Sequence, residues 1–462
     1  MQQVLLREGM LPVKKVTQCR ACGSKTLTPA FSIPIGASRP FSKSTGKHRD
    51  DYFLCDPSRH ARACGLLQSA VKGAQPEAIP SGRHSSNREQ LRAAATEALE
   101  MISGRDCAAL DVGCNDGALL SYYPRWVDRY GVDPSDLVDE IGEWAWTAKA
   151  TFPSQDLDNA FGEKKFDIVT AISVIEHIDD PRAFLTSVKE RLTEDGVFVL
   201  ETLYSPAVLT RNAIDVLQTN VSAVYSLGVL EWLVREADMK IFKGSLTSKD
   251  GGSIRLFITH KENNEFDFEP WFERMATLWD EENALAMRAL QPYQSFERRV
   301  EDVREAFVAI LEDMASRGEC AHILGADAQT EALLRWAGPA GKIITAAVDT
   351  AEARDSERLG AKGPRIISET ESRAAEPDYL IAPARYKREL MDRWRETILL
   401  GAQMIFVTPT PHIVTASNFA GEYGKVIAGG DGAAGAESLR TILAAAGGPR
   451  LVSENTKRAK SA

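Results

Sequence analysis

Strand and helix patterns alternate along this chain from residue 88 onward. A helical pattern over 88–102 is followed by four short apolar strand patterns, CAALDV, RYGVDP, FDIVTAI and GVFVLET. Helices are expected between them, one after Asn115 and one in PRAFLTSVKERL. Alternating units of this length are typical of a doubly wound, largely parallel α/β sheet. Such a sheet binds its ligands at the carboxyl ends of the strands.

A second alternation follows a long helical region at 271–318. Helices separate its strand patterns, which lie at 320–326, 344–349, 378–383 and 402–408. We therefore expect a second, smaller Rossmann-like α/β domain. Its first turn has only Gly325 before Ala326 and Ala328, too few glycines for a pyrophosphate to approach the backbone. A nicotinamide cofactor is not expected there.

The first strand of the first alternation leads into the turn LDVGCNDG, residues 110–117. Gly113 and Gly117 leave room for the backbone to approach a ligand, and Asp111 and Asp116 bring acceptors to the same rim. The glycine spacing differs from the GxGxxG fingerprint that holds a pyrophosphate. Carboxylates on the rim suit a cationic amino-acid nucleoside, and S-adenosylmethionine (SAM) is such a molecule. A purely structural turn is the alternative.

The next strand ends in GVDP, which places Asp133 at the same edge of the sheet as the turn. An acidic side chain about 20 residues after the glycine turn can bind both hydroxyl groups of a ribose. This position supports the prediction of a nucleoside site.

Cysteines gather near the N-terminus. Cys19 and Cys22 form a CxxC knuckle, and Cys55 and Cys64 follow in LCDPSRHARACGLLQ. Four thiolates around Zn²⁺ would close a structural tetrahedral site with no position open for catalysis. The second pair is spaced more loosely, so His60 could replace one of the cysteines. The surrounding segment is poor in core-forming residues, so we expect a structural metal ion to stabilise it. The alternative is that the four cysteines are unconnected residues of the core.

The charge of the chain limits its partners. A net charge of −10 would repel nucleic acid, and no block rich in Lys or Arg offsets it. No apolar stretch is long enough to cross a bilayer, and MQQVLLREGMLPVKK lacks the apolar run of a signal peptide. We expect a cytoplasmic protein, a monomer or homodimer, whose partner is a small-molecule acceptor.

The series LDVGCNDG, GVDP and FDIVTAISVIEHIDDP resembles that of class I SAM-dependent methyltransferases in order and spacing. With the cysteine knuckle in front and an α/β domain behind, nearly the whole chain resembles the zinc-containing nucleotide-sugar C-methyltransferases. These enzymes methylate carbon next to a ketone in deoxysugars of natural products. Further stretches carry the resemblance, namely CGLLQ, FVLETLY, YSLGVLEWLVREADMKI, DGGSIRLFI and PDYLIAP.

The resemblance implies an N-terminal zinc-binding lobe, a central Rossmann-like class I methyltransferase domain and a C-terminal Rossmann-like domain that binds the acceptor. Their expected ranges, with a Gly/Ala-rich tail at the end, are 1–80, 81–262, 263–415 and 416–462. Asp133 would bind the ribose, and Asp156, with its neighbour Leu157, the adenine edge. The methionine side would be lined by Asp111, Gly113, Asn115 and Gly117, with Asp116 on the same rim.

The chain departs from the family at the centre of the chemistry. Relatives place a Tyr-His-Glu-His run before the YSL helix, and its last histidine is thought to remove the proton beside the ketone. Here Gln218, Thr219, Asn220 and Val221 occupy those positions. None of these side chains can accept that proton near pH 7. Either another residue is the base, or the acceptor needs none, or the site no longer catalyses.

His177 in IEHIDDP is the leading candidate for a replacement base, because it follows the fourth strand at the ligand edge of the sheet. The alternative is that it only closes the SAM pocket. His84, Glu201 and Tyr204 are further candidates for the acceptor side, and Arg255 could bind an acceptor phosphate or carboxylate. We expect methyl transfer in line from SAM to carbon. An oxygen or nitrogen acceptor, or an inactive SAM-binding scaffold, is the alternative.

Overall fold

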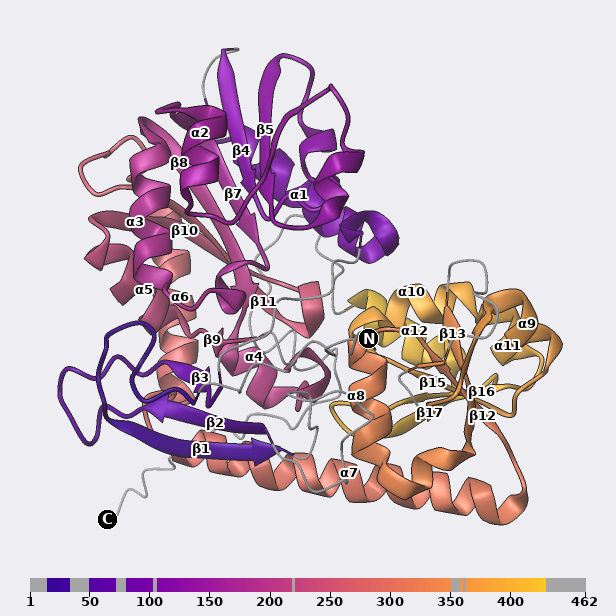
Figure 1. Cartoon of the computed structure of the whole chain (residues 1–462). Coiled ribbons are helices and arrows are strands. Elements are labelled where there is room, and N and C mark those ends of the chain that lie inside the picture. The colour runs from indigo at the N-terminus through magenta and orange to yellow at the C-terminus, as the bar shows by residue number, and fades with distance from the viewer. Residues whose placement is uncertain are drawn as a thin grey trace, which may run out of the picture.

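The structure is a computed structural model of the chain, and Figure 1 shows its arrangement. Three sheets, of four, seven and six strands, follow one another through the part of the chain that the structure describes. The expected α/β class with two Rossmann-like sheets is confirmed. The described residues are 15–33, 50–71, 80–102, 106–217, 221–349, 358–359 and 363–428. None of the helices found there is both long and apolar enough to cross a membrane.

The N-terminal sheet takes one of its strands from far along the chain. β1 (Leu27–Ile33), β2 (Asp50–Cys55) and β3 (Leu67–Ser69) form an antiparallel meander. The short strand β9 (Ala223–Val224) pairs with β3 at the edge of this meander. The lobe that carries the four cysteines is therefore joined by strand pairing to the segment that directly follows residues 218–220, which lie outside the described residues.

The central sheet has the order β10-β11-β8-β7-β4-β5-β6. β4 to β8 run parallel, and β11 pairs antiparallel with both β8 and β10. Chain order reverses between β4 and β7, so the crevice at their carboxyl ends is the ligand position of such folds. The strands are β4 (Cys107–Val112), β5 (Val127–Asp133), β6 (Trp146–Lys149), β7 (Phe166–Ile172), β8 (Leu192–Leu203), β10 (Met239–Thr247) and β11 (Ser253–His260).

Helices cover this sheet where the sequence predicts them, with one exception. The flanking helices are α1 (Ser85–Leu99), α2 (Gln155–Phe161), α3 (Pro181–Arg191), α4 (Ser205–Thr210) and α5 (Leu227–Glu236). The α-helix expected after Asn115 is wrong, because the chain forms only a 3-10 turn at Leu120–Tyr122. Pro124 follows two residues later, and the residue before a proline disfavours helical backbone, so the segment is too short for an α-helix.

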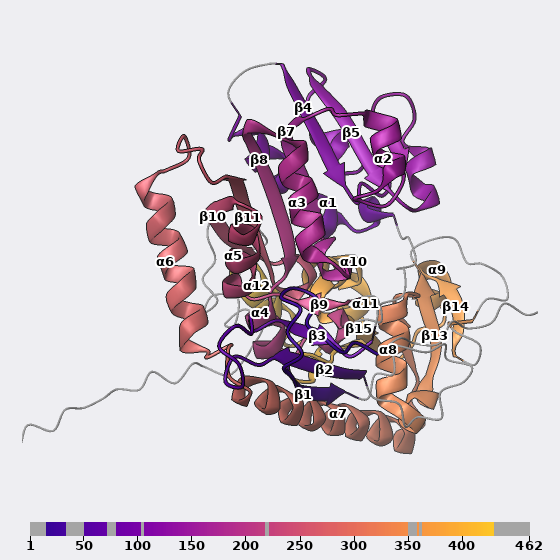
Figure 2. The same ribbon diagram turned by 60° about the vertical axis from the view of Figure 1, so that its left-hand side comes forward.

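Two helices connect the central domain to the C-terminal one. The predicted helical region is divided into α6 (Glu269–Ala284) and α7 (Gln291–Arg317). Figures 1 and 2 show α7 running beneath the N-terminal sheet and on to the C-terminal sheet. The helix packs on both, because its buried residues share one apolar cluster with residues of β1 and of β12 (Ala321–Leu324).

The C-terminal sheet has the order β14-β13-β12-β15-β16-β17, parallel except for β17. Its strands are β12 (Ala321–Leu324), β13 (Ile344–Asp349), β14 (Arg365–Ser368), β15 (Tyr379–Ala382), β16 (Gln403–Phe406) and β17 (His412–Val414). Its helices are α8 (Ala328–Ala337), α9 (Glu369–Ala374), α10 (Lys387–Arg393), α11 (Arg395–Leu399) and α12 (Phe419–Ala428). Helix α12 lies within the segment expected to be a tail, and residues 429–462 of that segment lie outside the described residues.

Candidate active site

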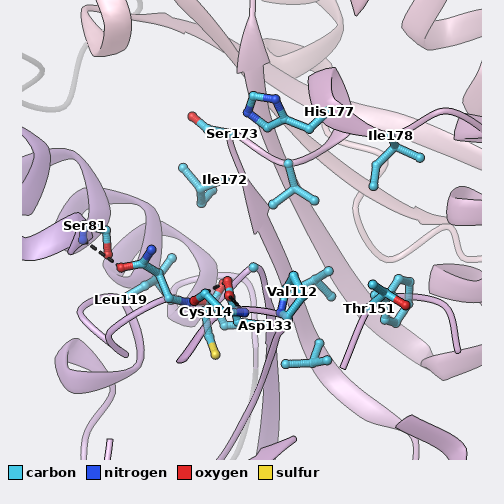
Figure 3. A pocket seen from close by; sticks show the side chains of 18 of the residues that line it. Ser81, Val112, Cys114, Leu119, Asp133, Thr151, Ile172, Ser173, His177 and Ile178 are labelled. Atoms are coloured by element: carbon cyan, nitrogen blue, oxygen red, sulfur yellow. Dashed lines mark hydrogen bonds between the residues drawn. The ribbon is translucent and has the colours of Figure 1, made fainter. Parts of the chain in front are cut away.

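A cavity of about 680 Å³ opens at the carboxyl ends of β4, β5 and β7 (Figure 3). This volume is within the range of about 300–1,000 Å³ typical of small-molecule sites. Five of the predicted site residues line the cavity, namely Asp111, Gly113, Asn115, Asp133 and His177. The structure thus brings together side chains that follow three different strands.

The glycine turn needs its glycines for different reasons. Gly113 has a φ of +75°, and a Cβ atom there would lie 2.6 Å from Cγ2 of Val174. Gly117 also has positive φ, but a Cβ atom there would meet Ile141 and Trp144 at 3.1 to 3.2 Å, away from the cavity lining. Gly113 therefore keeps the cavity floor open, and Gly117 permits the packing behind the turn.

Asp133 is held in place by backbone amides. Its Oδ2 accepts a hydrogen bond of 3.1 Å from the N–H of Asn115, and its Oδ1 accepts one of 2.8 Å from the N–H of Ser135. Figure 3 shows the carboxylate beside Cys114 on one wall of the cavity. Its position at the end of β5 suits the ribose role that the sequence predicts.

Asp111 is the buried acid of the turn. Its Oδ1 accepts a hydrogen bond of 2.6 Å from the hydroxyl of Thr170. Burial raises the pKa of Asp111 to about 7, although the Thr170 hydrogen bond opposes the shift. The carboxyl at this point of the cavity is therefore neutral or charged depending on pH in the physiological range.

The raised pKa of Asp111 predicts a pH dependence of cofactor binding. A cationic ligand in the cavity favours the charged carboxylate, whereas the empty protein holds a proton there below about pH 7. The affinity for S-adenosylhomocysteine (SAH), which carries an ammonium group, is expected to rise about tenfold from about pH 6 to about pH 8. Isothermal titration calorimetry across this range measures the change.

The control for this prediction is Asp111→Asn, whose amide oxygen can still accept the Thr170 hydrogen bond. We expect a dissociation constant that no longer changes with pH, and a variant whose dissociation constant changes with pH as in the wild type would contradict the assignment.

The same pKa shift of Asp111 affects the free energy of unfolding of the ligand-free protein, in the opposite direction with pH. Its folded state keeps a proton that the unfolded chain releases near the ordinary pKa of 3.8, so this group lowers stability as pH rises toward about 7.

Asp116 holds a neighbouring segment instead of lining the cavity. Its two carboxylate oxygens accept hydrogen bonds from the hydroxyl of Ser81, at 2.6 Å, and from the N–H of Gly82, at 3.0 Å. The N–H of Ser81 also donates to Oδ1 of Asn115 at 2.9 Å. Ser81 itself lines the cavity, so Asp116 shapes the site through this segment.

His84 continues the same segment into contact with the C-terminal domain. Its Nδ1 lies 3.2 Å from Oε1 of Glu389, and its ring stacks on Tyr386 with centroids 4.1 Å apart. Burial opposes ionisation of Glu389, but hydrogen bonds from His84 and Ser86 outweigh it and lower the pKa of Glu389 to about 2. The structure places His84 beside a second, smaller cavity of about 50 Å³ and outside the lining of the main one.

His177 lies in the main cavity. It ends the 3-10 turn Ile175–His177 after β7 and is seen with Ser173 across the cavity from Asp133 (Figure 3). The preceding Glu176 is buried and accepts a hydrogen bond of 2.8 Å from the hydroxyl of Thr202. Of the four residues predicted to act in catalysis, His177 is the one that the structure brings to this cavity.

Glu201, Tyr204 and Arg255 lie in the core instead of facing an acceptor. Glu201 is fully buried and accepts a hydrogen bond of 2.8 Å from Nε of Arg255, whose guanidinium also binds Glu97. The hydroxyl of Tyr204 donates to Glu282 at 2.9 Å. The structure does not bring these three side chains into the cavity, so their predicted contacts with an acceptor are not seen.

Asp156 also lies outside the cavity lining. It is exposed in the first turn of α2, while its neighbour Leu157 is buried. The adenine contact assigned to Asp156 has no counterpart in the cavity wall. Residues at this end of the cavity are instead Ala150, Thr151 and Phe152, from the loop after β6.

The sequence did not single out Lys249, which lines the same cavity. Its Nζ donates to Asp250 at 2.8 Å, and its side chain is 10% exposed. Burial disfavours the charged form, but Asp250 and Glu201 outweigh this effect and raise the pKa of Lys249. The signal in the sequence is the run KDGGS, in which Asp250 and both glycines adopt positive φ directly after a strand.

The four N-terminal cysteines meet at one point. Their Sγ atoms all lie within 4.8 Å of one another, and Cys19 and Cys64 are 3.6 Å apart. A tetrahedral zinc ion with Zn–S bonds of about 2.3 Å needs Sγ atoms about 3.8 Å apart, so these thiols fit it. His60 is exposed, and its Nδ1 accepts a hydrogen bond from the N–H of Arg62, so it lies outside this cluster.

Two family models match the chain, one after the other. A methyltransferase domain matches residues 84–243, and a C-methyltransferase C-terminal domain matches residues 248–409. The C-methyltransferase NovU of Streptomyces niveus is 25% identical over 316 residues, which are 67% of this chain and 74% of NovU.

Other similar proteins match a smaller share of the chain. The ubiquinone biosynthesis O-methyltransferase of Azorhizobium caulinodans is 33% identical over 135 residues, 27% of this chain and 48% of that protein. The magnesium protoporphyrin IX methyltransferase of Synechocystis, solved with bound SAH, is 17% identical with a TM-score of 0.30, and the match covers 38% of this chain and 84% of that one.

The strand order, the glycine turn at the switch point and the two consecutive family matches agree with one another. The chain is therefore a class I SAM-dependent methyltransferase that carries a C-methyltransferase C-terminal domain.

Proposed function

We propose that this enzyme methylates a carbon atom of a small-molecule acceptor in natural-product or sugar-nucleotide-like biosynthesis. The observation that carries the proposal is the position of His177, which lines the same cavity as Gly113 and Asp133 of the SAM site. The proposed base and the cofactor turn thus share one cavity. The similarity to NovU covers 67% of this chain, and a C-methyltransferase C-terminal domain matches residues 248–409, which together favour carbon over oxygen as the methylated atom.

SAM supplies an electrophilic methyl group when it is bound. The imidazole of His177 can accept the proton from the acceptor carbon next to a carbonyl, which leaves an enolate as the nucleophile. The charged ammonium of Lys249 lies on the same cavity and can stabilise the negative oxygen of that enolate. The other residues of the site would hold the acceptor carbon in line with the bond between sulfur and the methyl group, and would exclude water.

We also propose that Cys19, Cys22, Cys55 and Cys64 bind one structural Zn²⁺. The distances between their Sγ atoms support this, and four thiolates leave no position open for substrate. The metal would then stabilise the N-terminal lobe and would take no part in methyl transfer itself.

Transfer from SAM with a ¹³C-labelled methyl group tests the proposed function. The zinc-loaded protein is incubated with nucleotide-linked keto sugars, and with phenols and amines for comparison. The chemical shift of the labelled carbon in the product tells carbon from oxygen or nitrogen as its partner. A carbon-bound methyl group is expected. An oxygen- or nitrogen-bound methyl group contradicts C-methylation, and no transfer to any keto acceptor by a protein that binds SAM favours a non-catalytic scaffold.

A further inference from the structure

Arg20 connects the cysteine lobe to the wall of the SAM cavity. It lies in the knuckle between Cys19 and Cys22, and its guanidinium side chain is only 4% exposed. Its Nε donates to Oδ1 of Asp179 at 3.2 Å. Asp179 belongs to the cavity lining and follows His177 by two residues. A side chain of the cysteine knuckle therefore touches the loop that carries the proposed base.

The same guanidinium is fixed to the lobe by two further hydrogen bonds. Nη1 donates to the carbonyl of Ser69 at 2.9 Å, and Nη2 donates to the carbonyl of Val71 at 2.6 Å. The backbone N–H of Arg20 donates to the buried Gln68 at 3.0 Å. The guanidinium group is planar, so the hydrogen bonds of Nη1 and Nη2 also fix the orientation of its Nε–H, which points to Asp179.

A second connection runs beside the first. The N–H of Ser69 in β3 donates to the carbonyl of Ser222 at 3.0 Å, and the N–H of Ser222 donates to the carbonyl of Glu176 at 2.7 Å. The hydroxyl of Tyr225 also donates to the carbonyl of Ile175. The loop from Ile175 to Asp179 is thus held from outside the central sheet, by the lobe and by the segment around β9 that pairs with it.

Arg20 acts on the loop through its fixed orientation, because its ion pair with Asp179 contributes little energy. The side chain of Asp179 is 41% exposed, and an ion pair with that much solvent contact is weak by itself. The side chain of Arg20 is buried, however, and Cys19 and Cys22 stand on either side of it in the chain. If the four thiolates are not held together, the backbone that carries the guanidinium loses the anchor that the metal would give it.

We infer that Arg20 is a positioning residue, which lets the metal-bound knuckle set the cavity wall formed by Ile175–Asp179 and, with it, the place of His177. The inference rests on the proposed metal and on the proposed role of His177. It makes SAM binding and base placement depend on the cysteine lobe, although none of the four cysteines of that lobe reaches the cavity lining.

The experiment compares Arg20→Gln with the wild type in the zinc-loaded full chain. The four thiolates are intact, so zinc content is expected to stay at the wild-type level. The dissociation constant of SAH, measured by calorimetry, is expected to rise about three- to tenfold, and amide exchange over 173–180 is expected to become faster. Arg20→Lys should recover only part of the loss, because one ammonium cannot replace a guanidinium fork.

Two further variants separate positioning from general damage. Arg62→Gln removes an exposed arginine of the same lobe and should behave as the wild type. Asp179→Asn leaves the knuckle untouched and should weaken SAH binding, and its effect should not add to that of Arg20→Gln, because both remove the same contact. Removal of zinc by a chelator should weaken SAH binding in the wild type and weaken it less in Arg20→Gln.

Wild-type affinity and exchange rates in a zinc-loaded Arg20→Gln protein would overturn the inference. If that variant loses its zinc, Asp179→Asn decides alone, and wild-type affinity and exchange there would overturn the inference equally. Failure of the wild type to bind SAH at all would be a different result, because it would contradict the methyltransferase assignment itself.

Discussion

Replacement of His177 by asparagine is expected to lower the rate of methyl transfer by about 10²- to 10⁴-fold, the usual contribution of a positioned general base. Asparagine is similar in size but cannot accept a proton near neutral pH. The affinity for SAH should stay close to that of the wild type, because Gly113 and Asp133 are untouched. Single-turnover rates with the acceptor found in the ¹³C transfer assay, together with calorimetry, measure the two effects separately.

The matched control for this variant is His260→Asn. His260 ends β11, its Nε2 is 3.5 Å from the carbonyl of Leu192, and it does not line the cavity. This variant should transfer methyl groups at the wild-type rate. A His177→Asn protein that keeps the wild-type rate would mean that another group is the base, or that the acceptor needs none.

Replacement of Cys55 by serine is expected to remove zinc from the protein almost completely. Three thiolates and a hydroxyl bind zinc far more weakly than four thiolates, and structural zinc sites are worth about 10–16 kcal/mol in small zinc-binding peptides. In the part of the lobe that the structure describes, only three short strands belong to the lobe itself, so amide protection over 50–71 should be lost with the metal. Zinc content by atomic emission and hydrogen exchange measure the two effects.

Cys320→Ser is the control for this prediction. Cys320 is partly buried in the C-terminal domain and lies outside the cysteine cluster. Its replacement should leave one zinc per chain and normal protection of the lobe. A Cys55→Ser protein with full zinc content, or with normal protection over 50–71 after zinc loss, would contradict a structural metal site.

The central sheet could be predicted because its parallel strands β4, β7 and β8 are each marked by a short, local run of mostly apolar residues. The buried strands β4 and β7 are mostly apolar, and their bounds agree with the predicted CAALDV and FDIVTAI. The prediction of a helix after Asn115 was wrong for an equally local reason. Pro124 ends the segment early, and the apolar pattern alone does not show this.

The cofactor side of the cavity could be predicted for a related reason. Asp111, Asp133 and His177 each follow a parallel strand, and the carboxyl ends of such strands meet at one edge. Position in the sequence was therefore enough to bring them together.

The acceptor side depends on contacts that the sequence does not contain. Glu201 and Arg255 are direct partners in the antiparallel pairing of β8 with β11, and this register turns both into the core. The contact of Arg20 with Asp179 joins residues 159 positions apart. Val221 stands where the resemblance places the base of the family, and it is buried, while residues 218–220 lie outside the described residues.

Methyl transfer by this protein requires that the cavity beside Gly113 binds SAM. Calorimetry of SAH with the zinc-loaded wild type, with Gly113→Ala and with Gly162→Ala tests it most directly. Both glycines have positive φ, but a Cβ atom at position 113 would meet Val174 at 2.6 Å, and one at 162 would meet nothing within 4 Å. We predict one SAH bound per wild-type chain, binding at least about tenfold weaker in Gly113→Ala, and unchanged binding in Gly162→Ala. No binding by the wild type, or equal binding by Gly113→Ala, would contradict the binding of SAM in this cavity.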